Sequence, residues 1–407
     1  MKKFLFFLLI SFFAFSFLYA DEEPEESGAD PKKPFRIPDR FFEIGLGANV
    51  HFSNNYLTIR QIFSDTIVLD LDDFDKNFNA AFGFGVTPFY FNFDSKKGWG
   101  FGLSAGLEAA GVIDISRNLL LFNEVKDDKS SFNGAVFATT EINTFFPVQK
   151  FKVSFKPAVY YPIAYFTSDL FYTFSNSSKG TEFNIGYDMY LYTAAPADGS
   201  SSGLTATPGF DFSFGLEYPL SKEIGLNEKY SFLDFDVGLD FVNIPVFSST
   251  LRDYSRIYSR MGTNGSIYIL GDDNDDAEFI SEDITTYGEK IIRFQRPFKV
   301  LLWANWRPFF GNQLFTFKPL LGFSVNQIYD DPFSVEAGFN ARIDLFNLFI
   351  TTAGINYTDR TWINSLDFAF NLRAFQFDFG IDMRSQNFIK SWQAGGVGFK
   401  TGIRFGW

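Results

Sequence analysis

The sequence predicts an all-β fold, a transmembrane antiparallel up-and-down β-barrel of about sixteen strands, within a range of roughly 14 to 18. Three observations predict it. The last strand-like segment alternates apolar and polar residues and stops on an aromatic one, and the chain begins with an export segment. Aromatic residues also make up 20% of the sequence, although its mean hydropathy is only −0.03. A barrel in lipid accounts for all three, because its strands need one apolar face and one polar face.

The last eleven residues form two opposite faces if they are extended, because successive side chains of a strand point to opposite sides. One face carries Val397, Phe399, Thr401, Ile403, Phe405 and Trp407, and the other carries Gly398, Lys400, Gly402, Arg404 and Gly406. A terminal strand that closes a barrel in lipid needs such an apolar face. The segment also resembles the carboxy-terminal assembly signal of bacterial outer-membrane barrels, through Lys400, Gly402, Phe405 and Trp407.

Residues 1–20 have the pattern of a secretory signal peptide. Lys2 and Lys3 form a basic start, an almost wholly apolar run follows, and Ala20 precedes an acidic segment. The apolar run is shorter than the roughly 20 residues that a membrane-spanning helix needs. Residues 21–38 are expected to form a disordered, acidic, Pro-rich leader. The chain has no Cys, which excludes disulfides and a lipid-bearing Cys.

Composition narrows the class of protein further. Phe occurs 58 times, and a soluble protein would seldom carry so many without long buried runs, whereas a barrel alternates them with polar residues. The formal net charge of −13 argues against nucleic acid as a partner, because that interface needs a basic stripe. A soluble β-sandwich or β-propeller is the alternative fold, although the sequence shows no fixed repeat of about 40 to 50 residues.

Strand-like runs fill residues 39–407, the expected barrel. The predicted strands are 41–54, 80–93, 98–112, 131–145, 151–162, 166–175, 181–193, 208–219, 231–241, 298–310, 314–327, 333–344, 347–358, 361–372, 374–384 and 397–407. The runs 151–162 and 166–175 could be one strand, and 254–270 could hide a hairpin.

The connections between these runs differ in length on the two sides. With both termini periplasmic, the periplasmic connections are mostly short and lie near 94–97, 146–150, 176–180, 220–230, 311–313, 345–346 and 373. The other set is mostly long, as expected of extracellular loops, and comprises 113–130, 194–207, 242–297 and 385–396. Residues 242–297 are predicted to be a long acidic extracellular loop.

The segment 55–79 does not fit a simple loop, because Ile59, Ile62 and Phe63 have helical spacing and further apolar residues follow. Apolar residues in an aqueous loop are expected to bury somewhere. The segment is therefore predicted to be a plug or gate in the barrel mouth, or else an extra hairpin arm above the membrane. An N-terminal plug in a mid-sized barrel resembles the long-chain fatty-acid transporters, the FadL-like family. That resemblance implies passive uptake of small hydrophobic molecules.

Two groups of residues are candidates for a chemical site. His51 is the single His, and no arrangement around it in the sequence supports a catalytic role, so no enzyme activity is predicted. Asp272, Asn274, Asp276 and Asp283 match four positions of a calcium loop, but Ala277 stands where the sharp turn needs Gly. A solvated acidic loop is the favoured interpretation, and no metal or other cofactor is predicted.

The residues predicted to line the lumen carry both signs of charge. They are Glu336, Arg342, Asp344, Asp367, Arg373, Asp378, Asp382, Arg384, Lys400 and Arg404. Interleaved acids and bases suit a polar channel that filters weakly by charge, or an interior plugged by mutually paired charges. A ring of one sign, which would indicate ion selectivity, is not present in this set.

The sequence thus predicts a passive channel or transporter for small, hydrophobic solutes in a bacterial outer membrane. The alternative is a structural or adhesive surface barrel whose extracellular loops bind a partner. Expected partners are outer-membrane lipid, the barrel-assembly machinery, periplasmic chaperones and the small-molecule solute. The sequence does not predict an oligomeric state.

Overall fold

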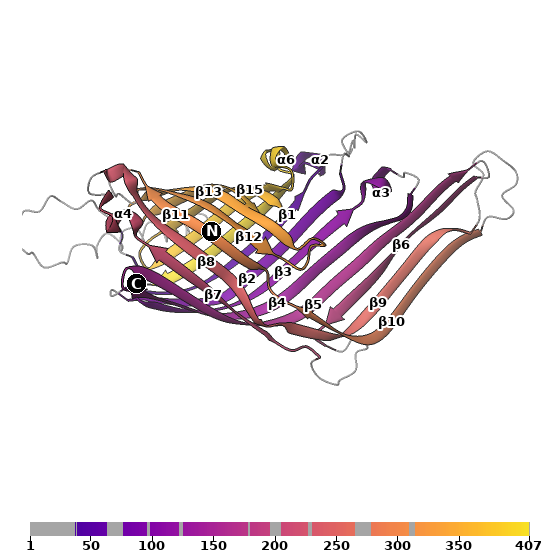
Figure 1. Ribbon diagram of the computed structural model, residues 1–407, viewed down its shortest axis with the longest axis horizontal. Coiled ribbons are helices and arrows are strands. Elements are labelled where there is room, and N and C mark those ends of the chain that lie inside the picture. The colour runs from indigo at the N-terminus through magenta and orange to yellow at the C-terminus, as the bar shows by residue number, and fades with distance from the viewer. Residues whose placement is uncertain are drawn as a thin grey trace, which may run out of the picture.

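The computed structural model is built almost wholly of β-strands (Figure 1). It describes residues 37, 39–62, 76–95, 98–121, 125–177, 180–195, 205–226, 230–264, 278–308 and 314–406. The strands are β1 (Phe42–Asn54), β2 (Phe78–Asp94), β3 (Gly100–Ile115), β4 (Val125–Val148), β5 (Phe151–Ser177), β6 (Gly180–Thr193), β7 (Gly209–Tyr218), β8 (Asp234–Phe247), β9 (Ser249–Asn264), β10 (Glu278–Phe294), β11 (Phe298–Arg307), β12 (Phe315–Val325), β13 (Phe333–Leu345), β14 (Phe349–Thr358), β15 (Thr361–Asn371), β16 (Phe375–Ser385) and β17 (Gly396–Gly406).

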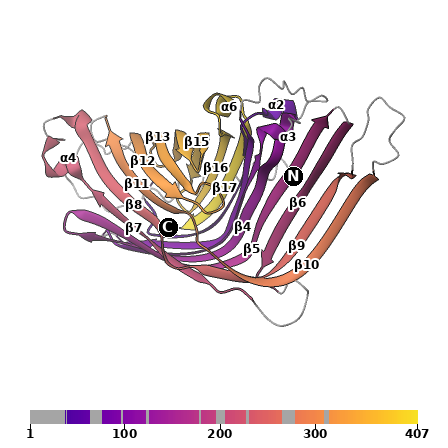
Figure 2. The same cartoon turned by 45° about the vertical axis from the view of Figure 1, so that its right-hand side comes forward.

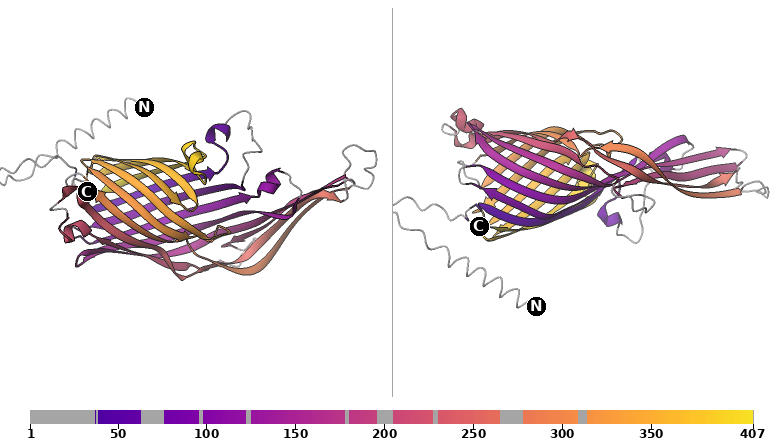
Figure 3. Two further views of the ribbon diagram at one scale, coloured as in Figure 1. Left: turned by 45° about the horizontal axis from the view of Figure 1, so that its top comes forward. Right: turned by 90° about the horizontal axis from the view of Figure 1, so that it is seen from below.

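Fourteen of these strands pair antiparallel in a closed ring, which confirms the predicted barrel. Consecutive strands pair except at two places, where β5 pairs with β7 and β8 pairs with β11. The last strand closes the ring, because β17 pairs with β1 from Glu43 opposite Gly406 to Ser53 opposite Gly396. Figure 3 shows the closed barrel with strands inclined to its axis.

The other three strands form an extension that we call the arm (Figure 2). The far half of β5 pairs with β6, β6 pairs with β9, and β9 pairs with β10. The arm projects from the end of the barrel opposite the C-terminus (Figures 1 and 2). Among the described residues, β10 pairs with β9 alone, so it is the outer edge of the arm.

In this region the structure confirms one alternative that the sequence left open and overturns one prediction. The predicted strands 151–162 and 166–175 are one strand, β5, in which Ile163 is the extra residue of a bulge beside Pro162. Proline is tolerated at a bulge because no ladder hydrogen bond needs its missing N–H. The predicted long loop 242–297 instead contains the end of β8 together with β9 and β10. These two strands carry charged residues on both faces, which hides the alternation by which a strand is recognised.

Apolar side chains point outward from the ring and most polar ones point inward. On β16, Phe377 and Ile381 are exposed on the outer face, whereas Asp378 and Asp382 line an internal cavity. The main apolar core is a small cluster near the arm end of the barrel, made of Ala81, Val112, Ala135, Phe137, Tyr160, Tyr192, Ala194, Leu251, Phe294 and Ile328. A chain with so little interior apolar packing must place its other aromatic residues against something outside itself.

Helices are short and lie at the two ends of the barrel. They are α2 (Ile59–Ile62), α3 (Arg117–Leu121), α4 (Leu220–Glu223), η2 (Ser231–Leu233) and α6 (Phe388–Trp392). No helix among the described residues is long and apolar enough to span a membrane. Of the predicted plug or hairpin 55–79, residues 63–75 lie outside the described residues. Helix α2 from this segment is bound to the loop between β16 and β17, where the Ile59 amide donates to the Ala394 carbonyl at 2.8 Å.

A buried arginine, Arg40, anchors the chain to the barrel just before β1. The Arg40 side chain is 2% exposed, and its guanidinium donates to Glu43 at 3.0 Å, to Gln376 at 3.3 Å, to Asn371 and to the Arg373 carbonyl. Ile37 is also buried, and its amide donates to the Phe346 carbonyl at 2.9 Å. These contacts fix the start of β1 against the turns β13–β14 and β15–β16.

We predict that Arg40→Ala lowers the free energy of unfolding by about 3 to 5 kcal/mol, because it leaves buried partners without their charge. The control is Arg252→Ala, which breaks an exposed pair with Glu289 and costs at most about 1 kcal/mol. Both losses can be measured by denaturant titration, with the fraction of folded protein read from the folded band in cold gel electrophoresis. Equal losses in the two variants contradict the role assigned to Arg40.

Candidate functional site

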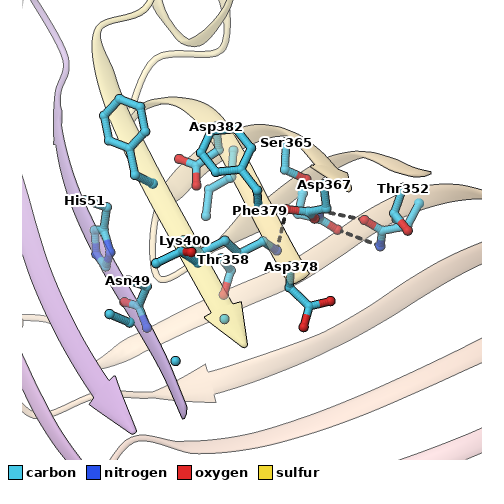
Figure 4. A pocket seen from close by; sticks show the side chains of 18 of the residues that line it. Asn49, His51, Thr352, Thr358, Ser365, Asp367, Asp378, Phe379, Asp382 and Lys400 are labelled. Carbon is cyan, nitrogen blue, oxygen red and sulfur yellow. Dashed lines mark hydrogen bonds and ion pairs between the residues drawn. The ribbon is translucent and has the colours of Figure 1, made fainter. Parts of the chain in front are cut away.

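The barrel encloses a cavity of about 910 Å³ (Figure 4). Strands β1 and β13–β17 supply most of its wall. The polar side chains that line it are Asn49, His51, Thr87, Tyr90, Lys299, Glu336, Asn340, Thr352, Asn356, Thr358, Ser365, Asp367, Asp378, Asp382, Arg384, Lys400, Thr401 and Arg404. Apolar side chains, among them Leu301, Leu320, Ile350 and Ile363, lie between these polar groups, so the wall of the lumen is mixed.

The charges of this lumen cancel in pairs. Lys400 contacts Asp367 at 2.6 Å and Arg404 contacts Asp378 at 2.7 Å. Arg384 donates to Asp382 at 2.9 Å, and Lys299 lies 3.4 Å from Glu336. Figure 4 shows Lys400 reaching towards Asp367 across the strands. A wall of matched ion pairs presents no net charge to a solute, so it selects only weakly between cations and anions.

Glycines on β2 make room for the lumen side chains of β1. His51 lies opposite Gly83 and Asn49 lies opposite Gly85 in the antiparallel pairing. A Cβ atom on Gly83 would collide with the His51 ring, and one on Gly85 would lie 2.6 Å from Nδ2 of Asn49. The two polar side chains therefore fold flat against the wall of the barrel instead of filling its centre.

Seven of the ten residues predicted to line the lumen are on the wall of this cavity, namely Glu336, Asp367, Asp378, Asp382, Arg384, Lys400 and Arg404. The other three are not. Arg342 donates to Asp344 at 3.3 Å near the far end of β13, and Arg373 lies in the β15–β16 turn with φ of 64°. Asp344 is buried at the end of β13, where it accepts a hydrogen bond from the backbone amide of Asn347 in the next turn at 2.7 Å.

A second cavity, of about 260 Å³, lies next to the polar lumen and shares Asn49 and His51 with it. Its wall includes Ala110, Ala135, Phe137, Tyr165, Phe294 and Ile328, and we call it the aromatic chamber. Phe294 lies at the centre of its rings, with centroids 5.3 Å from Phe137 and 5.4 Å from Tyr165. The volume is below the range of roughly 300 to 1,000 Å³ typical of drug-sized ligands, so it suits a small solute.

The connection between β12 and β13 crosses the mouth of the barrel. We call its residues Asn326–Pro332 the strap. Its neck is closed by the Asn326 amide, which donates to the Pro332 carbonyl at 2.8 Å. At its tip, Asp330 accepts from the Ser131 hydroxyl at 3.2 Å and from the Asn133 amide at 3.4 Å, both on the distant strand β4. Ile328 is 9% exposed and packs into the apolar cluster beneath.

Charged residues close the mouth on the other side of the strap. Lys299 lies 2.8 Å from Asp359 and 3.4 Å from Glu336, whose side chain is almost fully buried. The Tyr329 hydroxyl donates to the Asp359 carbonyl at 2.9 Å, and burial raises the pKa of this hydroxyl, so it remains a donor at neutral pH. Asp359 and Arg360 have φ of 45° and 63°, which makes a tight two-residue turn between β14 and β15.

A third cavity, of about 460 Å³, lies on the outer side of the strap, and we call it the vestibule. Its wall includes Asp114, Tyr329, Asp330, Asp359, Arg360 and Gln386. The strap residues Tyr329 and Asp330 thus face the vestibule, while Asn326, Gln327 and Ile328 face the aromatic chamber. The strap separates the two cavities.

The other candidate residues fall in different places. His51 lines the lumen against Gly83. Of the proposed calcium ligands, only Asp283 is among the described residues, and it lies on β10. In the part of the chain that the structure describes, no three His, Cys, Asp or Glu residues group as a metal site. Lys400 faces the lumen and Phe405 faces outward on β17, while Trp407 lies outside the described residues.

The comparisons with known proteins found similar structures but no similar sequence. No protein-family model and no curated protein matches the chain. The toluene transporter TodX of Pseudomonas putida matches with 10% identity and a TM-score of 0.47, over 91% of each chain. The CymD monoaromatic hydrocarbon channel matches with 10% identity and a TM-score of 0.44, over 91% of this chain and 89% of that one.

A different kind of barrel is also found. The translocator domain of the autotransporter NalP from Neisseria meningitidis matches with 6% identity and a TM-score of 0.33, over 91% of this chain and 90% of that one. The function of the present chain is therefore argued from its own cavities and contacts.

Sequence reasoning missed the strap and the aromatic chamber. The strap was expected to be part of a short connection after residue 327. Its one available signal is Ile328-Tyr329, two apolar residues between a predicted strand and the turn residues Asp330-Asp331-Pro332. Apolar residues in a short connection indicate that the connection packs against something. The chamber joins residues from six separate strands and the strap, and no local pattern reveals it.

We predict that Lys400→Gln makes residual ion conductance through the lumen prefer cations by about two- to three-fold, because Asp367 is left without its partner. The reversal potential in a salt gradient across a planar bilayer measures the preference. The double variant Lys400→Gln, Asp367→Asn restores neutrality and is expected to return to the value of the unchanged protein. A reversal potential that is the same in the unchanged protein and in both variants contradicts the pairing of Lys400 with Asp367.

Proposed function

We propose that the protein is a passive channel that carries small, uncharged, hydrophobic solutes across a bacterial outer membrane. The observation that carries this proposal is the aromatic chamber, which leads from the strap into a lumen whose charges cancel. The wall is mainly apolar around Phe137, Phe294 and Ile328, although polar side chains such as Asn49 and His51 also line it. A solute without polar groups therefore loses least on entry, since a polar group buried against the rings would lose its hydrogen bonds to water. In the lumen beyond the chamber, the charged side chains are paired with one another, so they do not bind the solute tightly.

The membrane follows from the outer face of the barrel. Phe377, Phe379, Ile381 and Phe399 are exposed on adjacent strands, and their neighbours along each strand point into the lumen. In hydrocarbon every backbone N–H and C=O needs a partner inside the protein, and a closed barrel provides all of them. Export by the segment 1–20 and assembly through Lys400, Gly402, Phe405 and Trp407 complete this proposal, with the assembly machinery and periplasmic chaperones as transient partners.

The solute class agrees with two further facts. The predicted plug in a mid-sized barrel resembles the FadL-like family, and the solved structures are those of a toluene transporter, TodX, and a monoaromatic hydrocarbon channel, CymD. Neither of these proteins is described as an enzyme, and no catalytic role is proposed for His51, which rests against Gly83 in the lumen.

The arm favours a second candidate function, the binding of a partner at the cell surface. Phe279 is 70% exposed, Tyr287 59% and Ile291 64%, all on the edge strand β10. Exposed apolar residues on an edge strand attract other polypeptides, and the acidic and basic residues between them limit that attraction. Binding of a partner that is abolished by Phe279→Ser with Tyr287→Ser, without any loss of solute passage, would favour this candidate.

We predict that the protein speeds entry of N-phenyl-1-naphthylamine into vesicles whose outer leaflet is lipopolysaccharide, a leaflet that excludes apolar solutes. The rate is read from the fluorescence gained in the inner leaflet, against empty vesicles. Sugars of similar size are expected to enter at least about tenfold more slowly, because the few polar side chains on the chamber wall cannot replace all the hydrogen bonds to water that a sugar loses there. Entry no faster than in empty vesicles contradicts the proposed function.

We also predict that Leu366→Arg lowers folding stability in bilayers by about 2 to 4 kcal/mol, as expected for a charge that faces lipid near the midplane. The matched control is Thr352→Arg, which places the same side chain on the lumen wall and is expected to cost less than about 1 kcal/mol. Urea titration of both variants in lipid vesicles measures the costs. A reversed order of the two costs contradicts the assignment of the faces.

A further inference from the structure

The two sides of the strap are held by contacts of different kinds. Towards β14 and β15, the strap is held by the Tyr329 hydroxyl, which donates to the Asp359 carbonyl at 2.9 Å, and by the ion pair of Asp331 with Arg360. Towards β4, the strap is held by the packing of Ile328 and by two hydrogen bonds of Asp330, at 3.2 and 3.4 Å. On the chamber side, Ile328 is therefore the apolar strap side chain that a solute meets.

An apolar solute further lowers the cost of opening at Ile328. This side chain packs against the wall of the aromatic chamber, beside Phe137 and Phe294. A solute that enters the chamber covers the same apolar surface that Ile328 leaves, so little apolar area is exposed to water in the exchange. A polar solute covers that surface poorly and loses its own water, so it gains nothing from displacing Ile328.

The neck of the strap is arranged to stay closed while the tip moves. Asn326 accepts from the amides of Ile328 and Tyr329, each at 3.3 Å, in addition to its bond with Pro332. Tyr329 is held separately, by its hydroxyl on Asp359 and by the Arg360 guanidinium 5.6 Å from its ring centroid. These contacts hold Tyr329 against the β14–β15 turn. The parts of the strap that can move away from the chamber are therefore the Ile328 side chain and the tip at Asp330.

We propose that Ile328 is the specificity-determining residue of the channel: a solute passes from the vestibule to the aromatic chamber by displacing this side chain. The inference rests on the proposed function and adds the point at which the solute is selected. The size of the side chain sets the width of solute that passes, and its apolar character sets the polarity. The hydrogen bonds of Asp330 to β4 determine how easily the strap tip is displaced.

A disulfide across the mouth tests the movement directly, because the chain has no Cys of its own. Ser131→Cys with Asp330→Cys replaces the hydrogen bond at 3.2 Å by a covalent link. We expect the oxidised double variant to slow entry of N-phenyl-1-naphthylamine at least tenfold, and a reducing agent to restore it. Each single variant serves as a control and is expected to keep at least half of the rate of the unchanged protein. An oxidised, cross-linked protein that still works at full rate overturns the proposal.

Substitution of Ile328 tests the selection itself. Ile328→Ala is expected to raise the entry of wider apolar probes relative to N-phenyl-1-naphthylamine at least threefold, and Ile328→Asn to reduce the preference for apolar probes over sugars. Leu320→Ala, at the wall of the lumen away from the strap, is the matched control and is expected to leave both ratios unchanged. Ratios that stay the same in both Ile328 variants, with folded protein on the gel, overturn the proposal.

A labelling experiment gives a readout that does not depend on transport. Ile328→Cys is expected to react slowly with a water-soluble maleimide and several-fold faster when an apolar solute occupies the chamber. A labelling rate that the solute does not change counts against displacement of Ile328. If the unchanged protein carries no probe at all, the proposed function itself fails, whereas transport that is indifferent to Ile328 and to the cross-link refutes only this inference.

Discussion

The pairing of β17 with β1 is the contact on which the rest of the structure depends. It leaves the ring of strands without a free edge, and in hydrocarbon each unpaired backbone group would cost several kcal/mol. The same pairing fixes the register, because a slip by one residue would turn Lys400 and Arg404 towards lipid and Phe399 and Phe405 into the lumen. The pairing that closes the ring therefore also keeps the apolar side chains on the lipid face and the charged ones on the lumen face.

The register also decides what the lumen can do. Acidic and basic residues on β11, β13, β15, β16 and β17 lie on the same face of the wall, where they pair with the adjacent strand or with the next strand but one. Each of these carboxylates therefore finds a cation within the wall. The result is a polar interior without net charge. Selection then falls to the mouth, where the strap places an apolar side chain over a small aromatic chamber. Burial of Ile328 contributes about 1.5 to 3 kcal/mol, a cost of opening that an apolar solute offsets when it covers the surface that this side chain leaves.

Much of the barrel could be predicted from sequence, because a two-residue period is a local signal. β1, β2, β3 and β12–β17 lie where alternation placed them, and β16 shows why: apolar residues from Phe375 to Met383 alternate with polar ones without a break. Seven lumen residues followed from the same period. The three exceptions, Arg342, Asp344 and Arg373, share the face or the turn but lie near the strand ends, and sequence alone does not show where a cavity ends.

The remaining features depend on contacts between distant residues. Of the arm, the sequence predicts β6 as a strand and leaves a hairpin within 254–270 open, but it does not reveal the pairing of these strands. β10 carries acidic residues on both faces, and β9 carries Arg on one face and Asp253 on the other, as strands do that are wet on both sides. Pro162 looked like an end of a strand, yet a bulge lets β5 continue through it. The strap joins Asp330 to Ser131, residues 199 positions apart, and only the closed ring brings them together.

The most direct test of the account is the accessibility of spin labels placed one at a time along β16, from Phe375 to Ser385, in lipid vesicles. The account predicts a two-residue period, with labels at 375, 377, 379, 381 and 383 reached by oxygen dissolved in the lipid. Labels at 376, 378, 380, 382 and 384 should instead be shielded from it. Equal accessibility at successive positions, or a protein that stays dissolved without lipid or detergent, would contradict it.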